Sequence, residues 1–187
     1  MLIGLCGLPF NGKGTVANIM KYSYGFTHMK FAGPLKDMLR VFLKHAGATD
    51  DVIERMIEGD LKEVPSPFLG NKTARWAMQS LGTEWGRDCI SSTLWGDLWQ
   101  SSAAKVLEDG GSVVVDDVRF ANEQERVKRL GGFIVHVHGR NGTASTHPSD
   151  NMDWLVADYT IDNNGSLAEL DDKVKQLIER IREDVWK

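Results

Sequence analysis

The glycine-rich segment from Gly7 to Thr15, Gly-Leu-Pro-Phe-Asn-Gly-Lys-Gly-Thr, constrains the fold of this chain more than any other feature. It directly follows an apolar run, Leu2 to Cys6, that is typical of a buried parallel strand. A helix is expected to follow it, from about Lys13 to Lys21. Glycines in such a turn let backbone N–H groups point inward, and the helix N-terminus adds partial positive charge. The segment therefore predicts a loop that binds phosphate groups.

Single positions of this loop suggest how a nucleoside triphosphate would be bound. Lys13 has the reach for the β- and γ-phosphates, and the hydroxyl of Thr15 can ligate Mg²⁺. We expect MgATP to bind here, and the positions expected to contact it are Pro9, Asn11, Gly12, Lys13, Gly14, Thr15 and Val16. The alternative is a glycine-rich turn with an incidental lysine.

Two carboxylates follow a second apolar run, Ser112 to Val115. In phosphate-binding proteins of this kind an acid at such a strand end holds Mg²⁺ or accepts a proton. A charge at the end of a buried strand is costly without a partner, which favours a site for Asp116 and Asp117. The alternative is that one of them caps the next helix. We expect Asp116 to serve the metal, and Arg119 to bind phosphate or to pair with Asp117.

Strands and helices alternate along the whole chain. Further strands are expected at Thr27 to Phe31, Phe133 to Val137 and Tyr159 to Ile161. This alternation predicts a three-layer α/β/α fold around a mostly parallel, five-stranded sheet. Ligands of such sheets bind beyond the carboxyl ends of the strands, which is where the glycine-rich loop and the two aspartates fall.

The helices and loops between these strands suggest one domain, 1–187, with two additions. Helical patterns begin at Pro34, at the Thr49 cap and at Thr73 and Leu94, which predicts a helical substrate-binding insertion at about 33–109. The polar stretch at about 139–155 predicts a lid. Residues 60–72 are expected to form a loop. The last helix is expected to start with a capping box of Ser166 and Glu169 and to carry the apolar stripe Leu167, Leu170, Val174, Leu177, Ile178 and Ile181.

Composition excludes several classes of protein. With 187 residues, 42% of them hydrophobic and 26% charged, the chain suits one buried α/β domain. A net charge of -4 gives no general attraction to nucleic acid polymers or to anionic membranes. No stretch approaches the ~20 apolar residues of a membrane helix, and the N-terminus lacks the basic region of a signal peptide. We therefore expect a cytoplasmic protein in which Cys6 and Cys89 are buried free thiols.

The middle segment carries an unusual mixture of polar and aromatic side chains. Arg87 can bind a phosphate bidentately, and Gln79 offers a donor and an acceptor to a base edge. An aromatic ring such as that of Trp76 gives a base a surface on which to stack. The alternative is an amphipathic helix whose tryptophans are core residues and whose Arg87 pairs with Glu84. The residues alone leave both interpretations open.

Several motifs, taken in order along nearly the whole chain, resemble those of bacteriophage-type deoxynucleoside monophosphate kinases, which are P-loop nucleoside monophosphate kinases. The Gly12-Lys-Gly-Thr15 variant of the loop is similar to that of adenylate kinases. The other matching motifs are Phe31-Ala-Gly-Pro-Leu-Lys36, Met78-Gln79, Leu81-Gly-Thr-Glu84 with Arg87, Asp117-Val-Arg-Phe-Ala-Asn-Glu123, His147-Pro-Ser-Asp150 and Ile161-Asp-Asn-Asn-Gly-Ser166. Phe10 departs from the pattern, because these kinases usually have glycine there, and Asp150 stands where the family often has glutamate.

The resemblance implies that the γ-phosphoryl group of ATP is transferred, with Mg²⁺, to a deoxynucleoside monophosphate. The residues expected to bind the monophosphate are Lys36, Trp76, Gln79, Glu84, Arg87, Asp117 and Asp150. Asn163 and Gly165 would border the adenine of ATP. The residues expected to be catalytic are Lys13, Asp116, Arg119 and Arg140, the last in the lid.

Two other functions stay open from the sequence. Kinases of other phosphorylated metabolites, such as phosphomevalonate kinases, look similar around the loop and the Leu81 to Glu84 motif. A P-loop hydrolase or switch is the second, although the chain lacks the Asn-Lys-x-Asp tetrapeptide of guanine-specific switches. The expected partner is a small-molecule nucleotide, in the host cytoplasm if the chain is phage-encoded. A homodimer, the base and sugar specificity and the role of His147 are left open.

Overall fold

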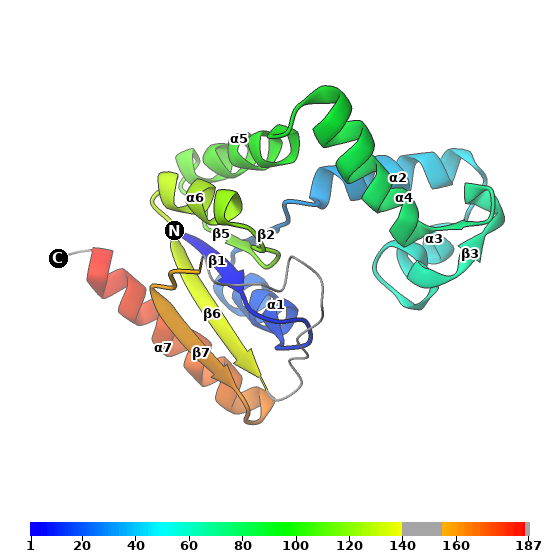
Figure 1. The fold of residues 1–187 in the computed structure, drawn as a ribbon. Helices are drawn as coiled ribbons and strands as arrows, with labels where there is room; N and C mark the ends of the chain where they lie inside the picture. The colour runs from blue at the N-terminus through cyan, green and yellow to red at the C-terminus, as the bar shows by residue number, and fades with distance from the viewer. Residues whose placement is uncertain (140–154, 186–187) are drawn as a thin grey trace. The chain divides into compact units, whose positions relative to one another are not determined.

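The computed structural model describes residues 1–139 and 155–185 and divides them into two compact units (Figure 1). The first unit combines Met1–Phe31 with Gln100–Lys187, and the second is Ala32–Trp99. The second unit falls inside the insertion predicted at about 33–109. The lid predicted at about 139–155 lies, apart from its first and last residues, outside the described residues.

The first unit is built on a five-stranded sheet in which every neighbouring pair of strands is parallel. Its order is β2-β5-β1-β6-β7, with β1 in the centre. The strands span Leu2–Cys6 (β1), Thr27–Met29 (β2), Val113–Val115 (β5), Phe133–Gly139 (β6) and Tyr159–Asn163 (β7). Each of the five predicted strands is present, so the expected sheet is confirmed.

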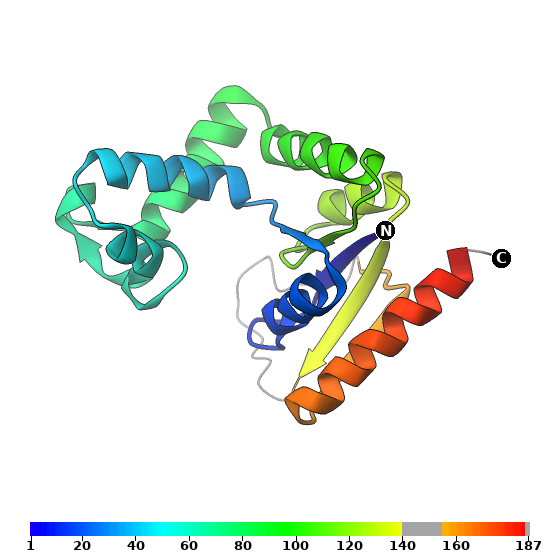
Figure 2. The same cartoon turned by 180° about the vertical axis from the view of Figure 1, so that it is seen from behind.

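Helices cover both faces of this sheet, which is why its central strands are continuous apolar runs rather than alternating ones. Helices α1 (Lys13–Tyr24) and α7 (Leu167–Val185) lie on one face, and α6 (Ala121–Arg129) lies on the other (Figures 1 and 2). Helix α5 (Leu94–Glu108) begins in the second unit and ends in the first. The first unit therefore has the predicted three-layer α/β/α arrangement.

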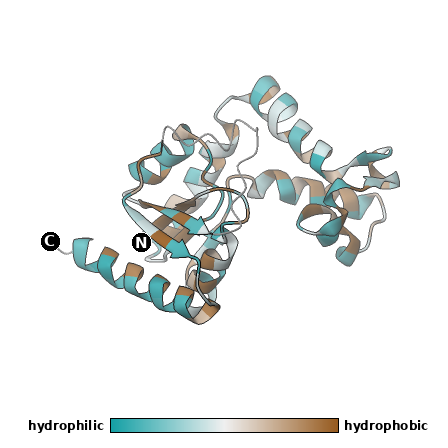
Figure 3. Ribbon diagram, turned by 60° about the horizontal axis from the view of Figure 1, so that its bottom comes forward, coloured by the Kyte–Doolittle hydropathy of each residue, from teal (hydrophilic) through white to brown (hydrophobic). Residues whose placement is uncertain are grey.

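The apolar stripe of α7 closes the core on its side of the sheet, and Figure 3 shows the helix banded with apolar and polar residues. Leu170, Val174, Leu177, Ile178 and Ile181 are all buried there. Leu167 was expected in the same stripe but is 66% exposed, because it stands in the first turn, beyond the edge of the core. The predicted capping box is confirmed: Ser166 N–H donates to Glu169 Oε2 (2.6 Å), and Glu169 N–H donates to Ser166 Oγ (3.3 Å).

The second unit is helical and has a hydrophobic core of its own. Its helices are α2 (Gly33–His45), α3 (Asp50–Ile57) and α4 (Ala74–Ser80), and α4 runs directly into a π-helix, η3 (Leu81–Ile90). The expected loop at 60–72 contains two 3₁₀ turns, η1 (Asp60–Glu63) and η2 (Pro67–Leu69), and a short hairpin of β3 (Pro65–Ser66) and β4 (Lys72–Thr73). Pro34 and Thr49 stand at the helix starts where they were expected.

The two cysteines differ in their surroundings. Cys6 is fully buried in β1, and burial raises the pKa of its thiol to about 12, so it stays protonated. Cys89 is exposed, contrary to the prediction that both thiols are buried, because it lies on the outer side of the π-helix. Among the described residues no helix combines the length and the apolar character that a membrane span requires.

The start of α6 is stabilised by a buried glutamate. Glu123, 8% exposed, accepts hydrogen bonds through Oε2 from the backbone N–H groups of Arg119 (2.7 Å) and Phe120 (3.2 Å). Phe120 is the N-cap residue of α6, where backbone N–H groups lack intrahelical partners, and Arg119 directly precedes it. Glu123 therefore caps this helix. From the sequence, Asp116 or Asp117 was the alternative candidate for this role.

We expect Glu123→Ala to lower the free energy of unfolding by about 1–2 kcal/mol, because two partly buried backbone N–H groups lose their acceptor. The matched control is Glu125→Ala on the same helix, where an exposed ion pair with Arg129 is removed at a cost of about 0.5 kcal/mol or less. Urea unfolding of both variants measures the difference. Equal losses in the two variants would show that Glu123 does not act as the cap.

Candidate functional site

The backbone of the glycine-rich loop follows a path that side chains would obstruct. Gly7 and Gly12 have positive φ values of 139° and 88°. A Cβ atom on Gly7 would lie 2.4 Å from the carbonyl oxygen of Val137, and one on Gly12 would lie 2.1 Å from Nδ2 of Asn163. At Gly7 the obstructing atom belongs to the backbone and cannot give way, so glycine is required there. At Gly12 the obstructing atom is the end of a side chain, and it is the positive φ that favours glycine. The loop is packed directly on the carboxyl ends of β6 and β7.

Asn11 fastens this loop to the sheet. Its side chain is buried, and Nδ2 donates to the carbonyl of Val137 at the end of β6 (2.9 Å). The backbone carbonyl of Asn11 accepts in turn from Nδ2 of Asn163, at the end of β7 (3.1 Å). Hydrogen bonds with β6 and β7 therefore hold the loop against the sheet.

The amino end of α1 offers donors to an anion. No side chain among the described residues caps this helix, and its first turn carries no acid. Lys13 Nζ lies over the loop and donates to the carbonyls of Gly7 (2.7 Å) and Leu8 (2.9 Å). Thr15 is exposed in the same turn. Uncapped N–H groups, a lysine and the helix dipole form a donor set that suits phosphate.

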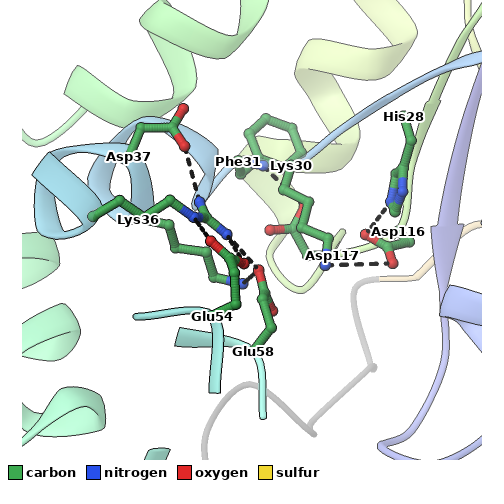
Figure 4. Close-up of polar contacts among 10 residues, drawn as sticks. His28, Lys30, Phe31, Lys36, Asp37, Glu54, Glu58, Asp116 and Asp117 are labelled. Carbon is green, nitrogen blue, oxygen red and sulfur yellow. Dashed lines mark hydrogen bonds and ion pairs between the residues drawn. The ribbon is translucent and has the colours of Figure 1, made fainter. Parts of the chain in front are cut away.

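Asp116 lies beside the loop at the end of β5. Its Oδ2 would be 3.6 Å from a Cβ on Gly14, the extra glycine of the Gly-Lys-Gly-Thr variant. His28 Nε2 lies 2.9 Å from Oδ1 and Lys30 Nζ lies 4.0 Å from Oδ2, both from β2 or the residues after it (Figure 4). Burial raises the pKa of the Asp116 carboxyl, but the contact with His28 and the charge of Lys30 outweigh it, so the net pKa is lowered. Asp116 is therefore held ionised.

Asp117 and Arg119, which were predicted as site residues together with Asp116, have different surroundings. Asp117 Oδ1 accepts the backbone N–H of Phe31 (2.9 Å), which ties the residues after β2 to the end of β5 (Figure 4). Arg119 is exposed, in the connection between β5 and α6. Asp117 thus joins two backbone segments of the first unit. Arg119 is exposed, so a ligand can reach it.

His136 and His138 lie on one face of β6, as their spacing predicted. Their ring centroids are 3.9 Å apart. Burial and then the nearby charges of His138 and Lys13 lower the pKa of His136, which favours its neutral form. Within 1–139 and 155–185, no three His, Cys, Asp or Glu side chains gather into a ready metal cluster.

In the second unit Lys36 belongs to a charged network. Its Nζ lies 2.7 Å from Oε1 of Glu58, and only 12% of the Lys36 side chain is exposed. Arg40 binds Glu54 (2.6 Å) and Asp37 (2.9 Å) in the same network (Figure 4). Lys36, which was predicted to bind the substrate, thus forms an ion pair with Glu58. The sequence did not predict this ion pair.

The other substrate candidates of the second unit lie on α4 and the π-helix, and all of them are exposed. They are Trp76, Gln79, Glu84 and Arg87. Lys72 Nζ lies 5.3 Å from the centre of the Trp76 ring, and the Ser80 hydroxyl donates to the Glu84 carboxylate. The alternative in which the tryptophans are core residues holds for Trp95, which is buried, and not for Trp76, which is 49% exposed.

Some predicted residues fall outside the described residues, and some relevant residues were not predicted. Arg140, His147 and Asp150 are in the first group. His28 and Lys30 are in the second: they meet Asp116 because β2 and β5 are neighbours, and the order of strands in a sheet has no local signature in sequence.

Gly165 lies against Glu169, whose Oε2 would be 2.3 Å from an added Cβ.

Phe10, which stands where similar loops have glycine, has a φ of 65° and is 79% exposed. The left-handed conformation costs an L-residue about 1–2 kcal/mol, whereas glycine adopts it freely. We therefore expect Phe10→Gly to be more stable than Phe10→Ala by about 0.5–1 kcal/mol in urea unfolding.

The control is the same pair of substitutions at Phe42, which is 54% exposed in α2. There glycine is expected to be less stable than alanine by about 1 kcal/mol, because the helical φ is ordinary. The same order of stability at both positions would contradict the strained conformation of Phe10.

Comparisons with known proteins bear on the family of this chain. The model of the family described as deoxynucleotide monophosphate kinase matches residues 50–174. A protein of Acanthamoeba polyphaga mimivirus, named provisionally as a deoxynucleotide monophosphate kinase, is 33% identical over 163 residues, covering 80% of each chain. The deoxynucleotide monophosphate kinase of Escherichia phage RB69 is 25% identical, covering 95% of this chain and 99% of its own.

Among solved structures, TT1252 from Thermus thermophilus aligns with 96% of this chain and 97% of its own, at 16% identity and a TM-score of 0.49, a likeness too low to carry an argument. The family match, by contrast, covers more than half of the chain, and the mimivirus relative is similar over most of its length. This chain belongs to the deoxynucleotide monophosphate kinase family and is a phosphotransferase.

Proposed function

We propose that this protein transfers the γ-phosphoryl group of ATP to a 5′-deoxynucleoside monophosphate, giving ADP and the deoxynucleoside diphosphate. The observation that carries the proposal is the loop at the end of β1, where Lys13 and the uncapped start of α1 adjoin the ionised Asp116. Membership of the deoxynucleotide monophosphate kinase family supports the choice of acceptor.

The donor side of the proposed site suits MgATP. The loop N–H groups and Lys13 bind the β- and γ-phosphates, and Thr15 and Asp116 hold the metal, Asp116 directly or through water. The charge set fits a divalent cation, because the carboxylate of Asp116 is ionised and lies beside Gly14. When bound, Mg²⁺ neutralises charge on the β- and γ-phosphates.

The transfer step asks this chain for position and charge rather than for a covalent intermediate. A phosphate oxygen of the acceptor forms a bond to the γ-phosphorus while the bond from that phosphorus to the β,γ-bridging oxygen breaks, and ADP leaves. Lys13 and Arg119 stabilise the negative charge on the group in transfer, and Arg140, outside the described residues, is proposed to do the same from the lid.

Asn163 and Gly165 are proposed to border the adenine at the turn after β7. The contacts of Asn163 add a second task, because its amide also holds the loop through the carbonyl of Asn11. Gly165 is packed against Glu169, so a side chain at that position would disturb the start of α7. Adenine binding and the position of the phosphate loop would thus share one turn.

The acceptor is proposed to bind through the second unit. Arg87 is the candidate for the monophosphate, and Gln79 and Trp76 are the candidates for the base, because all three are exposed and match its chemistry. Lys36, held by Glu58, would act from within its ion-pair network. Glu84, Asp117 and Asp150 complete the proposed set.

Removing the lysine of the loop tests the donor side. We expect Lys13→Ala to lower kcat/KM by at least about a hundredfold, since one cation that stabilises transferred charge is lost. Lys21→Ala, in the last turn of the same helix, is the control and should retain wild-type kinetics. The thermal transition of both variants should stay close to that of the wild type. Near-normal turnover by a folded Lys13→Ala variant would rule out the proposed site.

The dependence on acceptor tests the reaction. We expect ADP release from MgATP to rise at least about tenfold when a suitable deoxynucleoside monophosphate is added from a panel of the four bases. Matched ribonucleotides and a phosphorylated non-nucleotide, phosphomevalonate, serve as controls. ADP release that is equal with and without every acceptor would indicate a hydrolase instead.

A further inference from the structure

The helix that carries Glu84 and Arg87 changes its winding at the point where this motif begins. In α4 the buried positions Ala74, Ala77 and Met78 follow the α-helical spacing of three and four. The next ten residues form the π-helix η3, and the backbone N–H of Ser91 donates to the carbonyl of Gly86, five residues back (2.9 Å). π-Helical geometry is rare, usually limited to one turn, and frequent at functional sites.

The change of winding decides which residues face inward. Leu81 packs against the core of the second unit. A continued α-helix would bury Trp85, four residues later, whereas the structure buries Gly86, five residues later, and leaves Trp85 42% exposed. Each residue of the π-helix after Leu81 therefore points in a different direction around the helix axis from the one that it would have in a continued α-helix. The directions of Glu84 and Arg87, both exposed, depend on this turn.

Trp95, on α5, makes the contacts that hold the π-helix. Its Nε1 donates to the carbonyl of Gly82 (2.8 Å), and its ring fills the space beside Gly86. A Cβ on Gly86 would lie 2.5 Å from Nε1 and Cζ2 of this indole. The ring also lies 6.1 Å from that of Trp85. A buried indole therefore bridges the first and the second turn of the π-helix.

We propose that Trp95 is a positioning residue for the acceptor: its indole keeps residues 81–90 in the π-helical form and thereby aims Glu84 and Arg87. Trp95 is 6% exposed, so it acts through the helix and not by touching the nucleotide. The proposal rests on the proposed function, because only a nucleotide acceptor gives Glu84 and Arg87 a ligand to meet. It adds a residue from a different helix to that site.

The decisive variant is Trp95→Phe, which removes the indole N–H while keeping an aromatic ring in the core. We expect the KM for the deoxynucleoside monophosphate to rise about tenfold, as expected for the loss of one partly buried hydrogen bond, and the KM for ATP to change less than twofold. Amide hydrogen exchange of residues 82–91 should become faster, with α3 unchanged. The matched control is Trp99→Phe, in which an equally buried tryptophan of α5 is changed. Its two KM values should stay within twofold of the wild type.

The outcomes separate this inference from the proposed function. If wild-type ADP release does not depend on an acceptor, the proposed function fails, and exchange at residues 82–91 still shows whether Trp95 holds the π-helix. If the wild type is active and Trp95→Phe leaves both KM values unchanged, or raises both equally, the inference is wrong. Should Trp95→Phe not fold, Gly86→Ala crowds the same indole from the other side and is expected to raise the same KM selectively.

Discussion

The hydrogen bond from the Asn11 side chain to the Val137 carbonyl joins the phosphate loop to the sheet, and much of the site depends on it. It can form only because β6 is the parallel neighbour of β1, so that both strands end at the same edge. Asn163 adds a second attachment from β7. The loop is packed against β6 so tightly that Gly7 has no room for a side chain, and the positive φ of Gly12 favours glycine there as well. Under the proposed function, the contacts that fold the loop would also give it the conformation that surrounds phosphate.

At the same edge of the sheet, neighbouring side chains stabilise the charge of a buried carboxylate. Asp116 is buried, and an ionised carboxylate there would be costly without polar or charged partners. The parallel pairing of β2 with β5 brings His28 and Lys30 to it. Their contacts outweigh the effect of burial and keep the pKa of Asp116 low. A negative charge is therefore available beside the loop, where the proposed function needs a metal ligand, without destabilising the fold.

Local patterns in the sequence were enough to predict the strands, the glycine-rich turn between β1 and α1 and the capping box of α7, because each depends on residues close together in the chain. The contacts of Asp116 were not predictable in this way, since they depend on which strands are neighbours. The π-helix was also missed: its residues have the spacing of an ordinary amphipathic helix, and the cause lies in Trp95, on another element. The predictions that Leu167 and Cys89 are buried were wrong for a related reason: the hydrophobic character of a residue does not show where the core ends.

The proposed function assigns different tasks to the two units of this chain. The edge of the parallel sheet would bind the triphosphate, whereas the helical unit carries the exposed groups proposed to bind the monophosphate. Within the helical unit a buried tryptophan would set the direction of those groups. Donor binding and acceptor choice would then be governed by different cores, the one around β1 and the one that includes Trp95.

The central claim is that one phosphoryl group passes from ATP to a deoxynucleoside monophosphate on this protein. The most direct measurement follows the label of γ-³²P-ATP after incubation with Mg²⁺, the protein and each monophosphate, with chromatographic separation of the products. The proposed transfer gives labelled deoxynucleoside diphosphate, formed in step with ADP. Label found only in inorganic phosphate, or in no nucleotide other than ATP, would contradict it.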